Sequence, residues 1–139
     1  MKEIDAIRAL MAADMATVDQ HIEAKLASDV ALVNQISQYI IHSGGKRLRP
    51  MLTLTCARAC GFRANVHVSA AAIIEFIHTA TLLHDDVVDH SDMRRGKGTA
   101  NAVFGNAASV LVGDYLYSRS FQMMVEIGEM RIMEIMADA

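Results

Sequence analysis

The chain has 139 residues, of which 53% are hydrophobic and 5% aromatic, and its formal net charge is −3. This length allows one domain with a buried core, and the charge balance gives no general attraction to nucleic acid or to an anionic membrane. Ala, Leu, Ile, Val and Met supply the hydrophobicity, while one proline and eight glycines leave few breaks. These features favour long packed helices over a β-sandwich, so we expect an all-α fold.

The N-terminal part of the chain has a helical pattern. Apolar residues recur every three or four positions over residues 4–18 and again over residues 22–41, which predicts amphipathic helices. The pattern leaves open whether these are one helix or two. The first ten residues mix charged and apolar side chains, so we expect no signal peptide.

A break follows at residues 43–50, which read Ser-Gly-Gly-Lys-Arg-Leu-Arg-Pro. The two glycines permit close approach of the backbone to a ligand. They are followed by three cations, Lys46, Arg47 and Arg49. Pro50 suits the first turn of a helix that Gly61 would end. Taken alone, this stretch favours a connecting loop with solvated cations over an anion site.

Cys56 and Cys60 stand four residues apart in the helix predicted after Pro50. We expect two small buried side chains of a reduced, cytoplasmic protein. A zinc site would need two further ligands at suitable spacing, and the sequence offers none.

A long apolar helix is expected over residues 66–89. It is apolar nearly all round, which is typical of a central helix buried by its neighbours. Its most apolar run, residues 68–83, is interrupted by Glu75 and His78 and is too short to span a bilayer. We therefore expect no transmembrane segment.

This helix ends in a cluster of carboxylates that includes Asp85, Asp86 and Asp89. Clustered charge of one sign is costly to desolvate without a counter-ion. Asp85 and Asp89 share a helix face, so they can bracket a divalent cation that prefers oxygen, and Mg²⁺ fits best. Arg94 and Arg95 follow at once and are typical of groups that hold a polyanion against such an ion.

His78 and Thr81 lie on the same predicted helix face as Asp85. For His78 alone, a hydrogen-bonded core histidine is the favoured interpretation. Residues 90–100 predict a charged surface loop. Asn106 is a candidate cap for a helix over residues 107–127, in which Asp114 has no assigned role, and another helical run starts at Met130.

Three segments in order resemble motifs of the trans-polyprenyl diphosphate synthase family. Residues 85–89 and 93–96 match Asp-Asp-x-x-Asp and then Arg-Arg-Gly, and residues 44–50 match Gly-Gly-Lys-Arg-x-Arg-Pro. Residues 75–84 resemble the stretch before the aspartates in long-chain members. The similarity runs over essentially the whole chain. It implies a homodimeric all-α enzyme of which residues 1–139 form one incomplete domain, the N-terminal half of the isoprenoid-synthase helical bundle.

The resemblance implies Mg²⁺-dependent prenyl transfer, in which isopentenyl diphosphate condenses with a farnesyl-like allylic diphosphate. The implied product is a long all-trans polyprenyl diphosphate such as octaprenyl diphosphate, for ubiquinone side chains. By resemblance, the catalytic groups are Asp85, Asp89 and Arg94, with Arg94 on the allylic diphosphate. The implied metal ligands are Asp85 and Asp89, supported by Asp86. The implied contacts to isopentenyl diphosphate are Lys46, Arg49, His78 and Arg95, and Arg47 is a weaker candidate.

Product length in this family depends on side-chain size just before the aspartates. Here those positions hold Ala80 and Thr81, neither of them aromatic. The resemblance therefore implies an open path along the helix and a long product.

The sequence departs from the family in one respect. The family has a second aspartate-rich motif, whereas after Asp92 this chain has only Asp114 and Asp138. We therefore expect no prenyl transfer by this chain alone.

Two other functional classes remain open. One is a non-catalytic helical partner that binds diphosphate or stabilises another subunit, and the other is a helical protein with an ordinary charged loop. A terpene cyclase also carries an aspartate-rich helix, but the Gly-Gly-Lys-Arg and Arg-Arg-Gly elements fit a synthase better.

Overall fold

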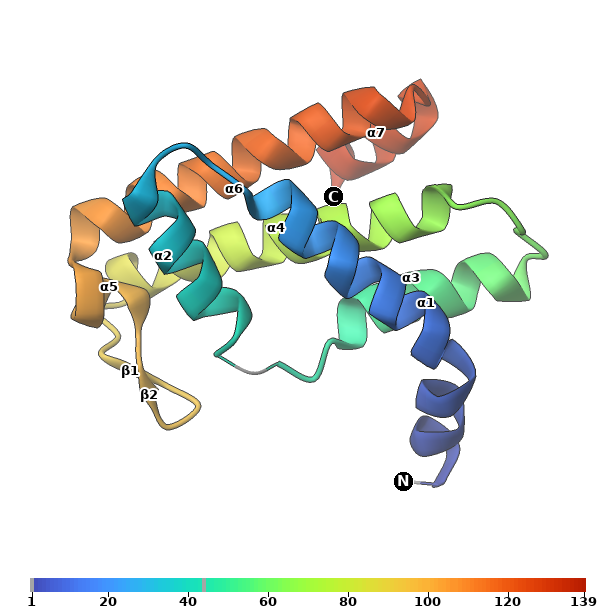
Figure 1. Ribbon diagram of the computed structural model, residues 1–139, viewed down its shortest axis with the longest axis horizontal. Coiled ribbons are helices and arrows are strands. Elements are labelled where there is room, and N and C mark those ends of the chain that lie inside the picture. The colour runs from blue at the N-terminus through green and yellow to red at the C-terminus, as the bar shows by residue number, and fades with distance from the viewer. Residues whose placement is uncertain (1, 44) are drawn as a thin grey trace. The chain divides into compact units, whose positions relative to one another are not determined.

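The structure is a computed structural model that describes residues 2–43 and 45–139. Within these residues the chain forms seven helices and one antiparallel hairpin of two short strands (Figure 1). In chain order the elements are α1 (Lys2–Leu26), α2 (Ala31–Ile41), α3 (Leu48–Ala59), α4 (Val66–Val88), β1 (Met93–Arg94), β2 (Lys97–Gly98), α5 (Ala100–Phe104), α6 (Asn106–Ile127) and α7 (Met130–Asp138). The all-α fold expected from the composition is confirmed.

The described residues divide into two compact units. The first unit contains residues 2–25, 47–75 and 120–139, and the second contains residues 26–46 and 76–119. Helices α4 and α6 each contribute one part to each unit. That residues 1–139 belong to one incomplete domain stays a prediction.

The first unit has a core formed by one face of each of its main helices. The buried side chains are Met11, Val18 and Ile22 of α1, Met51 and Leu54 of α3, Val68, Ala71, Ala72 and Ile73 of α4, and Met123 and Met124 of α6. Their spacing of three, four or seven residues within α1 and α3 places them on one face of each helix. Helical periodicity is therefore present in this core, although some apolar residues of the pattern in α1, such as Ile4 and Leu10, are exposed.

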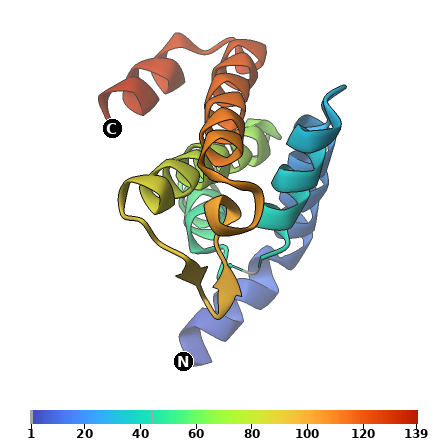
Figure 2. The same ribbon diagram turned by 90° about the vertical axis from the view of Figure 1, so that its left-hand side faces the viewer.

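The second unit packs the end of α4 and the start of α6 together with α2 and α5. Its core includes Ile36, Phe76, Leu83, Val112 and Leu116. Helix α5 lies beside α2 (Figure 2), where the rings of Tyr39 and Phe104 meet edge to face with their centroids 5.4 Å apart. The hairpin connects α4 to α5, and Tyr39 Oη of α2 donates to Gly98 O in its second strand.

The first helix is longer than its sequence pattern indicates. Helix α1 runs without a break to Leu26, and the chain leaves helical geometry at residues 27–30. There Ser28 N donates to Asn34 Oδ1 at 2.9 Å, and Asn34 Nδ2 donates to Ser28 O at 2.6 Å. These side-chain bonds replace helical backbone bonds and set the break after Leu26. The sequence pattern leaves open whether residues 4–41 form one helix or two, and the structure has two, separated at residues 27–30.

Residues 90–100 are not a simple loop. They contain β1 and β2, with Met93 paired to Gly98 and Arg94 to Lys97. The two residues between the strands, Arg95 and Gly96, have φ values of 52° and 78°. A two-residue turn with positive φ at both positions joins antiparallel strands with the correct twist. Helix α5, which the sequence pattern does not indicate, begins directly after the hairpin.

The two cysteines are exposed, so the expectation that they are buried is wrong. The buried face of α3 is set by Pro50, Met51 and Leu54. Cys56 follows Leu54 by two positions, about 200° around the helix, and therefore lies on the opposite side. Helical spacing alone does not show which face of α3 the core covers.

Helix α4 runs over 23 residues, and by length and composition alone it could cross a membrane. The helix is longer than the apolar run over residues 68–83, because it continues through Asp85 and Asp86 to Val88. Within its most apolar window, 56% of the residues are buried inside the structure. Core helices share this property, so the apolar character of α4 is weak support for a membrane span.

Candidate active site at the end of helix α4

The carboxyl end of α4 is shaped by a backbone capping motif. His90 adopts a left-handed conformation with a φ of 53°. Ser91 N donates to Asp86 O at 2.9 Å, and His90 N donates to Val87 O at 3.3 Å. This pair of bonds is the Schellman arrangement that satisfies the last carbonyls of a helix. It turns the chain sharply after Asp89 and directs it into the hairpin.

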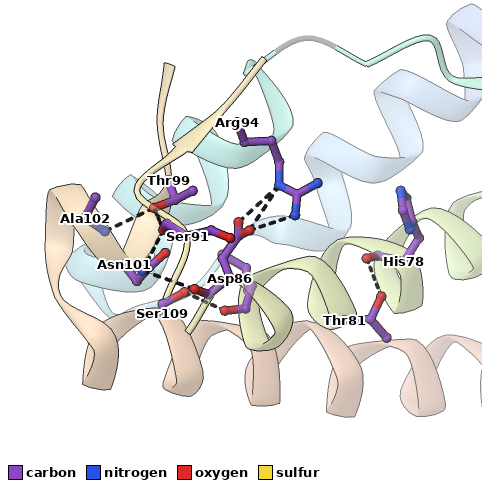
Figure 3. A network of polar contacts seen from close by, with 10 residues as sticks. His78, Thr81, Asp86, Ser91, Arg94, Thr99, Asn101, Ala102 and Ser109 are labelled. Atoms are coloured by element: carbon purple, nitrogen blue, oxygen red, sulfur yellow. Dashed lines mark hydrogen bonds and ion pairs between the residues drawn. The ribbon is translucent and has the colours of Figure 1, made fainter. Parts of the chain in front are cut away.

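The turn brings Arg94 of β1 back over Asp86 of α4 (Figure 3). Arg94 Nη2 donates to Asp86 Oδ1 at 2.7 Å, and Arg94 Nε donates to Asp86 Oδ2 at 3.2 Å. The Asp86 side chain is 1% exposed, whereas that of Arg94 is 35% exposed. This is a bidentate, charge-assisted pair with a buried carboxylate and a partly exposed guanidinium.

All three carboxylates of the predicted metal site raise the pKa of Arg94. The hydrogen bonds to Asp86 raise the pKa of Arg94, burial partly offsets this effect, and the charge of Asp86 adds to it. The negative charges of Asp85 and Asp89 raise the pKa of Arg94 further. Arg94 is therefore a permanent cation whose charge faces the acidic end of α4.

Asp85 and Asp89 are both exposed, in contrast to Asp86. Asp89 N donates to Asp85 O at 2.8 Å, so the two residues are successive turns at the helix end. In the part of the chain that the structure describes, no group of three or more His, Cys, Asp or Glu could hold a metal ion by itself. Mg²⁺ is commonly held by one or two carboxylates together with substrate phosphates and water. Two exposed carboxylates near a partly exposed arginine therefore fit Mg²⁺ that is held together with a phosphate group.

A network of polar contacts holds the hairpin against the end of α4 (Figure 3). Thr99 Oγ1 donates to Ser91 O at 2.7 Å, and Asn101 Nδ2 donates to the same oxygen at 3.1 Å. Asn101 Nδ2 also lies 3.4 Å from Asp86 O. Both side chains are buried. Thr99 and Asn101 connect the start of α5 to the turn that follows Asp89.

Sequence reasoning missed Thr99 and Asn101. Thr99 also caps α5, since its Oγ1 accepts from Ala102 N at 3.3 Å. A threonine three residues before a free backbone N–H is a recognisable cap, so this part of the network could have been found. Asn101 gives no local signal, because its contacts to Ser91 and Asp86 depend on the tertiary fold.

The length-setting candidates and His78 lie along α4, towards its middle. Ala80 is buried and Thr81 is exposed, so they face different sides of the helix. Thr81 Oγ1 donates to His78 O at 2.7 Å, and the His78 side chain is half-buried. Helix geometry thus places His78 and Thr81 on the α4 surface that leads to Asp85.

The basic residues in and after the Gly-Gly-Lys-Arg segment differ in exposure, since Arg47 is partly buried and Lys46 and Arg49 are exposed. Arg47 Nη1 donates to Glu75 Oε1 at 2.7 Å, and the Glu75 side chain is only 11% exposed. Lys46 and Arg49, on either side of Arg47, are exposed. Lys46 belongs to the second unit and Arg49 to the first, so a shared anion site at these two residues stays a prediction. The engagement of Arg47 with Glu75 agrees with its place as the weaker candidate.

Arg95 occupies the turn of the hairpin and is exposed. The structure therefore gathers Asp85, Asp86, Asp89 and Arg94 at one place in the second unit, with Arg95 adjacent in the chain.

Comparison with known sequences identifies relatives over nearly the whole chain. The sequence model of the polyprenyl synthetase family matches residues 30–139. The octaprenyl diphosphate synthase of Escherichia coli (strain K12) is 60% identical over 136 residues, which are 98% of this chain and 42% of that protein. The octaprenyl diphosphate synthase of Haemophilus influenzae is 53% identical over 139 residues and is likewise covered to 42%. The chain spans less than half the length of these relatives.

Solved structures show the same similarity. A decaprenyl diphosphate synthase from Rhodobacter capsulatus superposes with a TM-score of 0.92 at 52% identity, over 96% of this chain and 42% of that one. A polyprenyl synthase from Caulobacter crescentus CB15, complexed with calcium and isoprenyl diphosphate, superposes with a TM-score of 0.94 at 48% identity. The match covers 97% of this chain and 41% of that one. The aspartate-rich helix end, the arginine hairpin and the matches over nearly all residues agree: this chain belongs to the polyprenyl synthetase family.

Proposed function

We propose that this chain forms the first metal- and diphosphate-binding part of a prenyl-transferring enzyme. The proposed reaction condenses isopentenyl diphosphate with a farnesyl-like allylic diphosphate into a long all-trans polyprenyl diphosphate. The observation that carries the proposal is Arg94, held over buried Asp86 beside two exposed carboxylates. The 60% identity to an octaprenyl diphosphate synthase supports octaprenyl diphosphate, a precursor of ubiquinone side chains, as the product.

In this proposal Asp85 and Asp89 hold Mg²⁺ together with the allylic diphosphate, and Asp86 supports them. Bound Mg²⁺ would supply Lewis-acid stabilisation of the charge that develops on the departing diphosphate. Arg94 donates N–H groups to the same diphosphate and stabilises the same charge. The exposure of Asp85 and Asp89 supports these roles.

The second diphosphate, that of isopentenyl diphosphate, is assigned to Lys46, Arg49, His78 and Arg95. Cations that fix both diphosphates align the double bond of one substrate with the allylic carbon of the other. Such alignment supplies a large part of the rate advantage in reactions between two substrates. Lys46, Arg49 and Arg95 are exposed, so an anion in solution can reach them.

Product length is assigned to Ala80 and Thr81 on α4. Small side chains at these positions leave room for a growing chain alongside the helix. In a synthase that contains the remaining sequence, Ala80→Phe should shorten the product, which chromatography of the products would show. Unchanged product lengths would contradict this assignment.

We further propose that the chain does not turn over substrate in isolation, because it has one aspartate-rich cluster where the family has two. The complete enzyme would be a cytoplasmic homodimer in which residues 1–139 belong to a single domain. Incorporation of labelled isopentenyl diphosphate by the purified 139-residue chain would contradict the proposed inactivity.

The binding role can be tested on the chain itself by calorimetry with inorganic diphosphate and Mg²⁺. The unsubstituted chain should bind diphosphate in a Mg²⁺-dependent manner. Asp85→Asn and Asp89→Asn should each weaken binding roughly tenfold or more, since each replaces a charged carboxylate ligand by a neutral amide. Asp29→Asn is the matched control, because Asp29 is an exposed carboxylate of the same unit. Equal binding by all four proteins would contradict the proposed site.

A further inference from the structure

The three carboxylates at the end of α4 are not equivalent. Asp85 and Asp89 are exposed, while the Asp86 side chain is 1% exposed. Both oxygens of Asp86 accept hydrogen bonds from Arg94, at distances from 2.7 to 3.3 Å. A buried carboxylate with both oxygens occupied by a guanidinium is poorly placed to bind a metal ion, since either interaction would displace the other.

Asp86 is also fixed in position by its backbone. Its carbonyl oxygen accepts from Ser91 N at 2.9 Å and lies 3.4 Å from Asn101 Nδ2. The second strand of the hairpin is anchored from α2, where Tyr39 Oη donates to Gly98 O at 2.7 Å. The carboxylate and the strand that carries Arg94 are therefore both held in place, which favours one orientation of the guanidinium.

The orientation of Arg94 leaves one side of its guanidinium open. Its Nε and Nη2 face Asp86, and in Figure 3 the other terminal nitrogen points away from the carboxylate. Within the described residues no hydrogen bond reaches Arg94 Nη1. An arginine fixed at one edge presents its remaining donors to a phosphate with little loss of side-chain entropy.

We infer that Asp86 is a positioning residue that orients Arg94 for the diphosphate, and that it is not itself a metal ligand. The inference rests on the proposed function, because it names the anion that Arg94 meets. It separates Asp86 from Asp85 and Asp89, with which it shares the aspartate-rich motif.

Competing roles for Asp86 predict different results for diphosphate binding in the presence of Mg²⁺. If Asp86 only repelled the anion, Asp86→Asn would strengthen binding. If Asp86 were a metal ligand, Asp86→Asn would weaken binding whether or not Arg94 is present. If Asp86 acts through Arg94, Asp86→Asn should weaken binding by about tenfold and should have no further effect in an Arg94→Gln background.

The test is a double-mutant cycle in the full 139-residue chain, with inorganic diphosphate and Mg²⁺ as the probe and calorimetry as the readout. We expect Asp86→Asn, Arg94→Gln and the double variant to bind with similarly reduced affinity. Additive losses, or a gain of affinity in Asp86→Asn, would overturn the inference. Circular dichroism would confirm that each variant is folded.

A spectroscopic measurement on the unsubstituted chain covers the case in which Asp86→Asn does not fold. The Nε–H proton of Arg94 should be protected from exchange and shifted in the NMR spectrum, relative to that of Arg63, an exposed arginine. An Arg94 signal that exchanges as fast as that of Arg63 would overturn the positioning role. Absence of diphosphate binding by the unsubstituted chain would contradict the proposed function instead, so the two failures are distinguishable.

Discussion

A bidentate arginine–aspartate pair lies in each unit, Arg58 with Asp14 in the first and Arg94 with Asp86 in the second, and the two pairs differ chiefly in the burial of the aspartate. In the first unit Arg58 Nε and Nη2 donate to Asp14 at 2.9 and 3.0 Å, and the two side chains are 37% and 22% exposed. In the second unit the Asp86 side chain is 1% exposed beneath Arg94. Exposed pairs contribute little to stability, whereas breaking a buried pair leaves an uncompensated charge. The two pairs therefore have similar hydrogen-bond geometry, but breaking the pair with the buried aspartate should cost more stability.

The surroundings of the two pairs also differ. Asp14 has a second partner, His67 Nε2 at 3.2 Å, so it links α1 to both α3 and α4. Among the described residues, the Asp86 carboxylate accepts hydrogen bonds from Arg94 alone, which lies on the hairpin and is partly exposed. The first pair joins helices, while the second presents a cation beside two exposed carboxylates.

The largest effect on stability is expected from Arg94→Ala. The substitution leaves the buried Asp86 carboxylate without a partner, which costs roughly 3–5 kcal/mol in unfolding free energy. Urea unfolding followed by circular dichroism would measure it. Arg63→Ala, which removes an exposed arginine, should change stability by less than about 0.5 kcal/mol. Equal unfolding midpoints for the two variants would show that burial of Asp86 has no energetic consequence.

A smaller effect is expected from Gly113→Ala in the same unit. A Cβ at this position would overlap the imidazole of His84, so the imidazole must move. His84 would then lose its 3.1 Å contact to Val110 O and its 3.2 Å contact to Asp114. Overpacking of this kind costs about 1–3 kcal/mol.

The matched control for Gly113→Ala is the same substitution in a His84→Ala background. Without the imidazole the new methyl group has space, and alanine is favoured over glycine within a helix by about 1 kcal/mol. The effect of Gly113→Ala should therefore change sign between the two backgrounds. The same sign in both would contradict the proposed clash.

The helices of the first unit could largely be predicted from the sequence, because apolar periodicity extends over long segments, whereas the buried face of α3 could not. The second unit was predicted less well. The hairpin requires a positive φ at Arg95, a residue that rarely adopts it, and no local pattern indicates such a turn. The pairing of Asp86 with Arg94 and the contacts of Asn101 depend on that turn. The motif predicts that the aspartates and arginines form a site. The burial of Asp86 beneath Arg94, in contrast to the exposed Asp85 and Asp89, is visible only in the structure.

The stability contributed by the partly exposed pair in the first unit should depend mainly on acid pH. The hydrogen bonds from Arg58 are the main cause of the lowered pKa of Asp14, burial opposes this effect, and His67 lowers the pKa further. A carboxylate with a lowered folded-state pKa contributes stability above its unfolded value, about 3.9, and that stability is lost as the pH falls through the folded-state pKa. Asp14→Asn should remove this contribution, so its stability should fall less steeply than that of the unsubstituted chain below about pH 4. Parallel acid unfolding curves would contradict this prediction.

The smallest effect is expected at His21 of α1. Burial is the main cause of its lowered pKa, and Lys25 lowers it further, while Glu126 opposes the shift. Its stabilising contribution is complete above the unfolded pKa of about 6.5 and declines as the pH falls through the folded-state pKa. His21→Gln should therefore flatten the loss of stability just below about pH 6.5, as measured by thermal unfolding at a series of pH values. An unchanged pH profile would contradict it.

The comparison of the two arginine pairs is tested most directly by the affinity for inorganic diphosphate in the presence of Mg²⁺. Calorimetry would compare Arg94→Gln with Arg58→Gln, which removes the bidentate arginine of the first unit. We expect Arg94→Gln to weaken binding roughly tenfold or more, since it removes charge-assisted hydrogen bonds to the anion, and Arg58→Gln to leave binding unchanged. Equal affinities for the two variants would contradict the claim that the hairpin at the end of α4 forms the diphosphate site.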